Sequence, residues 1–162
     1  LTEHFKKQTP TMKKSILLSL IFISVNTLFA QNATDILGVW LNKEKDAQIE
    51  IYKEKEQFFG KIVWLAIAKN KNGEWMLDVN NPDEKLQTRK KLGMTVMHNL
   101  VWDADDKEWN NGKIYDAREG DTYSLFAKTN GLDILDLRGY IGFSLFGKTT
   151  RWTRSNLKQN AN

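Results

Sequence analysis

Short runs of β-branched and aromatic residues recur along this chain from residue 36 to residue 154, with turn-forming residues between them. Segments 47–52 and 122–128 alternate apolar and polar side chains, which is typical of strands with one buried face. Asn-Gly pairs, which favour tight hairpins because both residues adopt positive φ at small cost, occur at 72–73, 111–112 and 130–131. This pattern limits the chain to an antiparallel barrel or sandwich.

The strand segments are close enough together to predict one continuous all-β domain. Strong strand patterns occur at 36–41, 47–52, 58–65, 94–102, 113–115, 122–128, 132–140 and 143–154. We expect a small up-and-down barrel of about eight strands, because closure removes the free sheet edges that invite aggregation. The domain is predicted to span 31–162 with its core at 36–154.

Residues 66–93 interrupt the strand pattern, with only a short possible strand at 75–79. Around Asp78, the run Asn81-Pro82-Asp83 predicts a short helix that begins at Asn81 and ends at Gly93, because Asn caps helices and Pro suits their first position. A long loop of this kind is typical of a lid or rim, and equally of a plug that closes one barrel end.

The first 30 residues read as a targeting segment. Met12-Lys13-Lys14 is a basic start, residues 16–25 are apolar, and Ala30-Gln31 resembles a cleavage site. We expect residues 1–11 to be an upstream extension and 12–30 a signal peptide too short to span a bilayer. The mature chain would then be exported, to the periplasm or the medium.

The composition argues against several partners and sites. The first 30 residues contain four of the 24 basic residues and only one of the 20 acidic residues. The formal charge of +4 therefore falls to about +1 beyond them. No basic domain remains, so we expect no nucleic-acid partner. With no cysteine and one histidine, His98, beyond residue 30, we expect neither a metal site nor a cofactor.

The two ends of the core resemble lipocalin-like barrels. The first strand carries Gly38-Val39-Trp40, and the last carries Arg151-Trp152-Thr153-Arg154. In such barrels a first-strand Trp packs at the closed end beneath an Arg from the end of the chain. The resemblance implies structural closure by Gly38 and Trp40 with Arg154 or Arg151, in which the guanidinium covers the ring.

A second resemblance covers nearly all of residues 36–154. The chain is similar, in order and spacing, to the exported bacterial family of unknown function called DUF2147. The residues that carry this similarity are Gly60–Trp64, Asp78–Asp83, Gly112–Asp116, Gly120–Ser124, Arg138–Gly142, Phe146–Thr149 and Trp152–Arg154. The family implies a small lipocalin-like barrel and brings no established reaction.

The aromatic residues are the main functional clue. Some must fill the barrel, since an eight-stranded barrel holds side chains or one small ligand. The others predict a cup with polar tips that orient a ligand, and an inward Arg could hold a carboxylate. The candidates for the barrel interior are Trp64, Tyr115, Tyr123, Arg138, Tyr140 and Trp152.

We therefore expect an exported lipocalin-like protein, monomeric or weakly dimeric, that binds a small apolar or amphipathic molecule. The main alternative is an envelope interaction or structural module with a filled barrel and a contact patch of Trp75, Trp102 and Trp109 on loops. A hydrolase is a remote alternative, because it requires His98 and an acid to converge in a cleft. We expect no enzyme activity.

Overall fold

The computed structural model describes residues 31–158. It contains eight strands, β1 (Gly38–Leu41), β2 (Ala47–Glu54), β3 (Gln57–Leu65), β4 (Thr95–Asp103), β5 (Glu108–Asp116), β6 (Asp121–Thr129), β7 (Ile134–Tyr140) and β8 (Lys148–Arg154). Three short 3-10 turns accompany them, η1 (Ala33–Ile36), η2 (Glu84–Leu86) and η3 (Ser144–Phe146). The predicted upstream extension (1–11) and signal peptide (12–30) lie outside the described residues.

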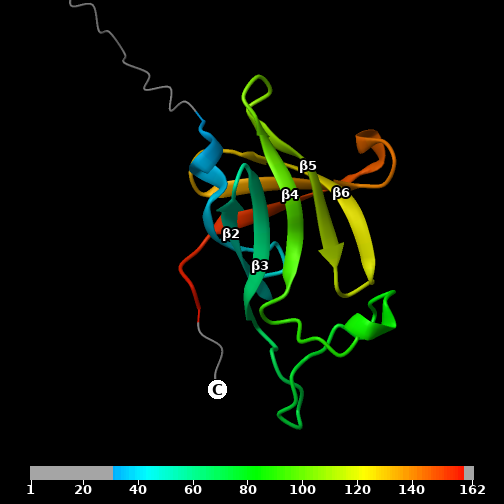
Figure 1. Ribbon diagram of the computed structural model, residues 1–162. Helices are drawn as coiled ribbons and strands as arrows, with labels where there is room; N and C mark the ends of the chain where they lie inside the picture. Colours follow the sequence, from blue (N-terminus) through cyan, green and yellow to red (C-terminus); the bar gives the residue numbers. More distant parts are fainter. Residues whose placement is uncertain (1–30, 159–162) are drawn as a thin grey trace, which may run out of the picture.

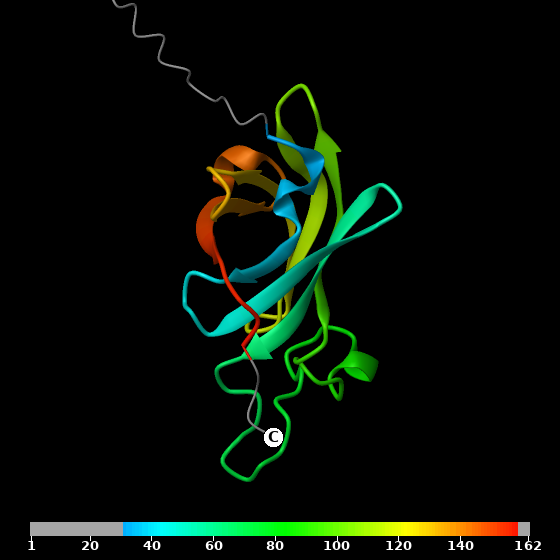
Figure 2. The same ribbon diagram turned by 90° about the vertical axis from the view of Figure 1, so that its left-hand side faces the viewer.

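The eight strands form a closed barrel in which every neighbouring pair is antiparallel. Odd strands therefore run one way and even strands the other, so the β1–β2, β3–β4, β5–β6 and β7–β8 connections share one end. Figures 1 and 2 show the excursion 66–94, in green, at this end and η1, in blue, at the opposite end. We call these the open end and the closed end. The predicted up-and-down barrel is confirmed.

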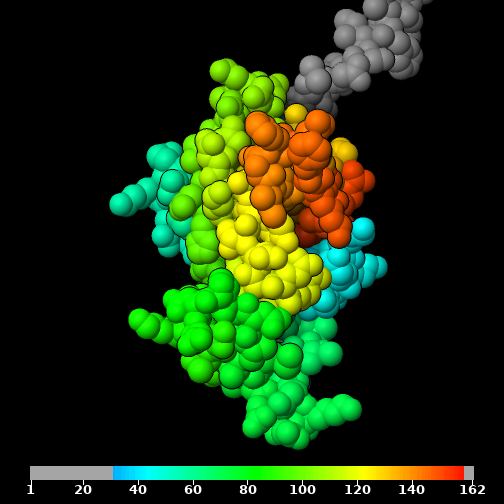
Figure 3. Space-filling view, turned by 90° about the vertical axis from the view of Figure 1, so that its right-hand side faces the viewer, coloured from blue at the N-terminus to red at the C-terminus, as the bar shows by residue number. Residues whose placement is uncertain are grey.

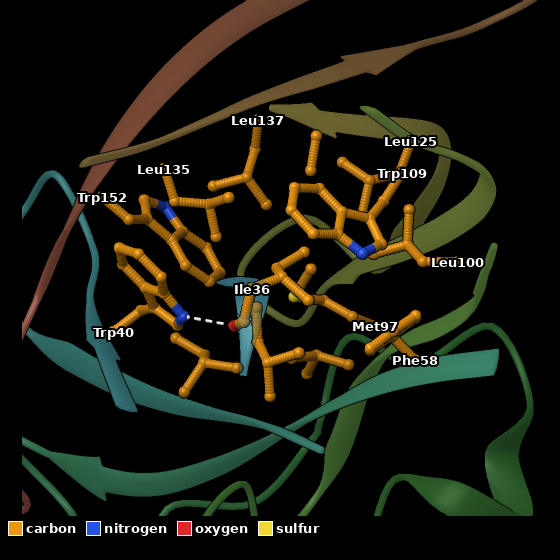
Figure 4. Close-up of a cluster of buried hydrophobic side chains, with 14 of the residues drawn as sticks. Ile36, Trp40, Phe58, Met97, Leu100, Trp109, Leu125, Leu135, Leu137 and Trp152 are labelled. Atoms are coloured by element: carbon orange, nitrogen blue, oxygen red, sulfur yellow. Dashed lines mark hydrogen bonds between the residues drawn. The ribbon is translucent and has the colours of Figure 1, made fainter. Parts of the chain in front are cut away.

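Turn η1 closes the barrel at the closed end. Ile36 is fully buried, and its side chain lies among the aromatic and aliphatic side chains of the core (Figure 4). The indole N–H of Trp40 donates to the carbonyl of Ile36 at 2.8 Å, and the indole N–H of Trp109 donates to the carbonyl of Ala33 at 3.1 Å. Both indoles thereby bury their ring without leaving a donor unpaired, which burial would penalise.

Arg154 fastens η1 to the end of β8. Its guanidinium lies 4.2 Å from the ring centroid of Trp40. It donates to the carbonyls of Asp35 (2.7 Å), Leu37 (2.8 Å) and Leu132 (2.6 Å). A side chain at Gly38 would crowd this group, since an added Cβ would stand 3.0 Å from its Nη1 atom. The resemblance to lipocalin-like barrels implied this contact for Arg154 or Arg151.

Arg151 has a different role from Arg154. It forms a two-point ion pair with Asp136 on the outer face of β7 and β8, at 2.7 and 2.9 Å. Its side chain is 58% exposed, whereas that of Arg154 is 30% exposed. Arg151 therefore takes no part in closing the barrel.

The predicted turn at Asn111-Gly112 is wrong, because both residues lie inside β5. Asn111 has φ of 59°, and the β5–β6 register shifts between Trp109 and Gly112, so the pair forms a β-bulge. The residues that favour a hairpin also favour a bulge, since both need positive φ. An added Cβ at Gly112 would stand 2.5 Å from the side chain of Leu100, so this glycine admits Leu100 to the core.

Other predicted boundaries also change. The predicted helix from Asn81 to Gly93 is wrong, because the segment holds only η2, capped by Asp83, whose side chain accepts from the amide of Lys85. With few apolar side chains to pack, a longer helix has nothing to stabilise it. The possible strand at 75–79 is reduced to isolated bridges, and the last strand begins at Lys148 because η3 and its flanking residues occupy 141–147.

We predict that Arg154→Ala lowers the free energy of unfolding by about 2–4 kcal/mol, because it removes three charge-assisted hydrogen bonds and the contact with Trp40. Arg151→Ala, the matched control, should cost less than about 1 kcal/mol, as exposed ion pairs do. Urea unfolding followed by tryptophan fluorescence measures both. Equal losses in the two variants would contradict the role assigned to Arg154.

Candidate functional site

A cavity of about 730 Å³ occupies the open half of the barrel. Large side chains pack the closed half, whereas smaller aliphatic side chains line the walls of the open half. The buried lining residues are Ile49, Ile62, Val96, Leu125, Leu137 and Trp152, each at most 7% exposed. We call this space the cup. Its volume lies within the range of small-molecule pockets, roughly 300–1,000 Å³.

Strand alternation places these side chains in the cup. On β6, β7 and β8 the inward positions include Leu125, Leu137 and Trp152. Gly139 follows Leu137 on the same face and also lines the cup. An added Cβ there would stand 3.6 Å from the Cβ of Tyr123, an ordinary contact distance. The missing side chain at Gly139 thus leaves space in the cup.

Polar side chains gather at the mouth of the cup. Tyr123 donates its hydroxyl to Glu119 at 2.7 Å, and this bond, with burial and nearby acids, raises the pKa of Tyr123 to about 12. Arg118 forms a two-point ion pair with Asp116, at 2.7 and 3.0 Å. Burial would raise the pKa of Asp116, but the hydrogen bonds and charge of Arg118 outweigh it and lower the pKa. The carboxylate of Asp116 is therefore ionised at neutral pH.

The excursion 66–94 is fastened to the mouth through one buried carboxylate. Asp78 is fully buried and accepts from Arg89 (2.8 and 2.9 Å), from the hydroxyl of Tyr115 (2.7 Å) and from the amide of Asn81 (2.8 Å). Asn81 also donates to the hydroxyl of Tyr115 at 3.1 Å. Burial and the bond to Asp78 raise the pKa of Tyr115. A buried carboxylate paired this completely ties the loop to β5.

A second set of contacts joins the excursion to the β5–β6 turn. Asn80 donates to the carbonyl of Arg118 at 2.7 Å, and Lys91 donates to the carbonyl of Ala117 at 3.0 Å. Gly120 has φ of 83°, and an added Cβ would stand 2.0 Å from the carbonyl oxygen of Asn80. Only glycine fits there, so the turn and the excursion form one rigid side of the mouth.

Three of the six predicted interior residues line the cup. They are Tyr115, Tyr123 and Trp152. The motif Asp78, Asn81, Pro82 and Asp83 does not line it. Asp78 and Asn81 instead hold the rim, and Asp83 caps η2. The predicted motif therefore fixes the excursion 66–94 in place and does not contact the interior of the cup.

Trp64, Arg138 and Tyr140 do not line the cup, which corrects their prediction as interior candidates. The β2–β3 register shifts between Gln48 and Ile49, so Trp64 pairs with Gln48 and lies under the C-terminal segment, 4.4 Å from the ammonium of Lys158. Leu137, Gly139 and Ile141 face the cup, so Arg138 and Tyr140, which alternate with them, face outward. Sequence alone does not determine such a register.

The aliphatic side chains of the cup were not predicted from the sequence, because the candidates were chosen among aromatic residues with polar tips. The available signal was alternation: Ile49, Leu125 and Leu137 each occupy the apolar phase of their strand. Reading each strand for its inward face, rather than for aromatic type, would have found them.

His98, the histidine considered for a catalytic role, lies away from the cup. His98 is on β4, paired in register with Lys113, and its ring packs edge-on against Phe59 at 6.3 Å. Among residues 31–158, no three His, Cys, Asp or Glu side chains are placed to hold a metal ion. No helix within that range is long and apolar enough to cross a membrane.

Comparisons with known proteins agree with this architecture. The sequence model of a family described as "Uncharacterized protein conserved in bacteria (DUF2147)" matches residues 38–154. Protein HP1028 of Helicobacter pylori, described as belonging to the lipocalin family, is similar in structure with a TM-score of 0.63. The two are 22% identical over 74% of this chain and 82% of that one, which establishes a common fold. No curated protein matches the chain.

We predict that Asp78→Asn loosens the excursion, because an amide cannot accept from Arg89, Tyr115 and Asn81 together and leaves Arg89 unpaired. Amide hydrogen exchange at Met76 and Lys91 should accelerate by more than about tenfold. Asp105→Asn, an exposed carboxylate on the closed-end β4–β5 turn, is the control and should leave exchange unchanged. Unchanged exchange in Asp78→Asn as well would rule out this anchor.

Proposed function

The chain belongs to the DUF2147 family, and we propose that this member binds a small apolar or amphipathic molecule in the cup. The observation that carries the proposal is the uneven filling of the barrel. The closed half is packed with Trp40, Trp109 and their neighbours, whereas the open half keeps a cavity of about 730 Å³. A barrel of eight strands is narrow enough for side chains to fill completely, so stability alone does not require a cavity.

The lining favours one class of ligand. The walls are aliphatic around the indole of Trp152, so they favour a hydrocarbon chain or ring system that leaves water. The mouth carries the Tyr123–Glu119 pair and the Arg118–Asp116 pair. These groups suit a polar head that remains at the solvent boundary. An amphipathic molecule with its apolar part inward matches both features.

The shared fold with a lipocalin-family protein supports this proposal, because small barrels of this kind hold one small ligand. The alternative of a filled barrel with an outer patch of Trp75, Trp102 and Trp109 is disfavoured. Trp109 is fully buried in the core, where it packs against Trp102. A hydrolase is disfavoured because His98 is not among the residues that line the cup.

The proposal includes export. Residues 12–30 have the composition of a signal peptide, and the described barrel begins after them. Cleavage after Ala30 would release the barrel into the periplasm or the medium as a monomer or weak dimer. Such a location gives the protein access to apolar molecules of the cell envelope.

We predict that Gly139→Leu blocks the cup. The new side chain starts at ordinary contact distance from Tyr123 and Ile114 and extends into the cavity. Binding of the neutral apolar probe N-phenyl-1-naphthylamine, followed by fluorescence, should weaken by about tenfold or more. Thr153→Leu adds a leucine to the exposed face of β8 and is the control, with binding unchanged.

Native mass spectrometry of protein purified from its own host complements this test. A bound molecule should accompany the wild type and be absent from Gly139→Leu, and N-terminal sequencing should begin at Gln31. Equal probe binding by wild type and Gly139→Leu, or no binding by wild type, would overturn the proposed site.

A further inference from the structure

The connection between β7 and β8, residues 141–147, is an unusual surface segment. Four of its seven residues are large and apolar, and all four are exposed: Ile141 (70%), Phe143 (78%), Leu145 (80%) and Phe146 (79%). The segment contains no charged residue. We call it the apolar loop. Apolar groups exposed together at this density mark an interaction site on a soluble protein.

The fold holds the apolar loop in this exposed conformation. Arg138 donates to the carbonyls of Ser144 (2.7 Å) and Leu145 (3.0 Å) and to the hydroxyl of Thr149 (2.9 Å). An added Cβ at Gly147 would stand 2.6 Å from a backbone carbonyl oxygen of β7, so the loop lies tight against that strand. These contacts use the backbone of the loop and leave its apolar side chains directed to solvent.

The apolar loop borders the mouth of the cup. Ile141 and Phe146 contribute to the cup lining as well as to the exposed surface. Ile67, from the excursion 66–94, also lines the cup and is 69% exposed. Figure 3 shows the apolar loop, in orange, and the excursion, in green, on opposite sides of the yellow β6 region. Because Ile141 and Phe146 belong to both, the exposed apolar surface of the apolar loop is continuous with the lining of the cup.

Charge is distributed unevenly between the two ends of the barrel. The connections at the open end (42–46, 66–94, 117–120 and 141–147) contain nine basic and seven acidic residues. The turns at the closed end (55–56, 104–107 and 130–133) contain two basic and four acidic residues. An anionic surface would therefore meet the open end more favourably than the closed end.

We propose that the apolar loop inserts into the interface of an anionic lipid bilayer and sets the mouth of the cup against the membrane. Phenylalanine and leucine side chains on a firm loop suit the boundary between headgroups and acyl chains. The small excess of basic charge orients the barrel, and apolar insertion supplies most of the affinity, because surface charge this slight attracts weakly. The contact gives an apolar ligand a path between bilayer and cup that avoids water.

Flotation with vesicles of equal parts phosphatidylcholine and phosphatidylglycerol tests the proposal. The chain from Gln31 is used, since it contains the whole closed barrel and lacks the apolar segment 16–25, which could bind lipid by itself. The wild type should float with the vesicles. The double variant Phe143→Ser/Leu145→Ser should reduce the floated fraction by roughly fivefold or more.

Two matched variants make the result specific. Leu132→Ser removes a side chain that is 57% exposed at the closed end and should float like the wild type. Gly139→Leu blocks the cup and should also float, so membrane contact and ligand binding can fail separately. Both altered loop positions are exposed, so the thermal unfolding midpoint of the double variant should match that of the wild type.

The proposal is overturned if the wild type does not float, or if the double variant floats as well as the wild type. It is also overturned if sedimentation shows that the wild type dimerises through a contact that the double variant loses while neither binds vesicles. In that case a second copy of the chain, and not a membrane, covers the apolar loop.

Discussion

The contact between Arg154 and Trp40 is the interaction on which the barrel depends. The seam between β1 and β8 comprises only the register pairs Trp40↔Arg154 and Leu41↔Thr153, so few backbone hydrogen bonds close the sheet. Arg154 strengthens this seam, because it lies over the ring of Trp40 and binds three carbonyls around it. The chain contains no cysteine, so no disulfide supports the closure.

Dense packing at the closed end stabilises the barrel and offsets the side-chain burial that is missing in the open cup. At the closed end, Gly112 and Gly60 lack side chains and thereby admit Leu100 and Met97 to the core. This packing concentrates the burial of large side chains beside η1. Gly139 lies in the open half, where an added Cβ would meet its nearest neighbour, Tyr123, only at an ordinary contact distance of 3.6 Å. The same residue type therefore tightens one half of the barrel and enlarges the other.

The arrangement of the strands could be predicted from the sequence, because alternation and Asn-Gly pairs are local signals. The side chains that line the cup were less predictable, since they depend on register. Trp64 left the interior because of a bulge in the β2–β3 pairing, and Asn111-Gly112 formed a bulge instead of a turn. The role of Asp78 depends on Tyr115 in β5 and on Arg89, which lies eleven residues farther along the chain. No local sequence pattern specifies these partners.

The central claim is that the open half of the barrel admits an apolar molecule while the closed half does not. The most direct measurement is an NMR titration with 1-decanol that follows the six tryptophan indole N–H signals. The signal of Trp152, in the wall of the cup, should shift on binding. The signals of Trp40 and Trp109, bonded to carbonyls at the closed end, should stay in place. Shifts at Trp40 and Trp109 with none at Trp152 would contradict the central claim.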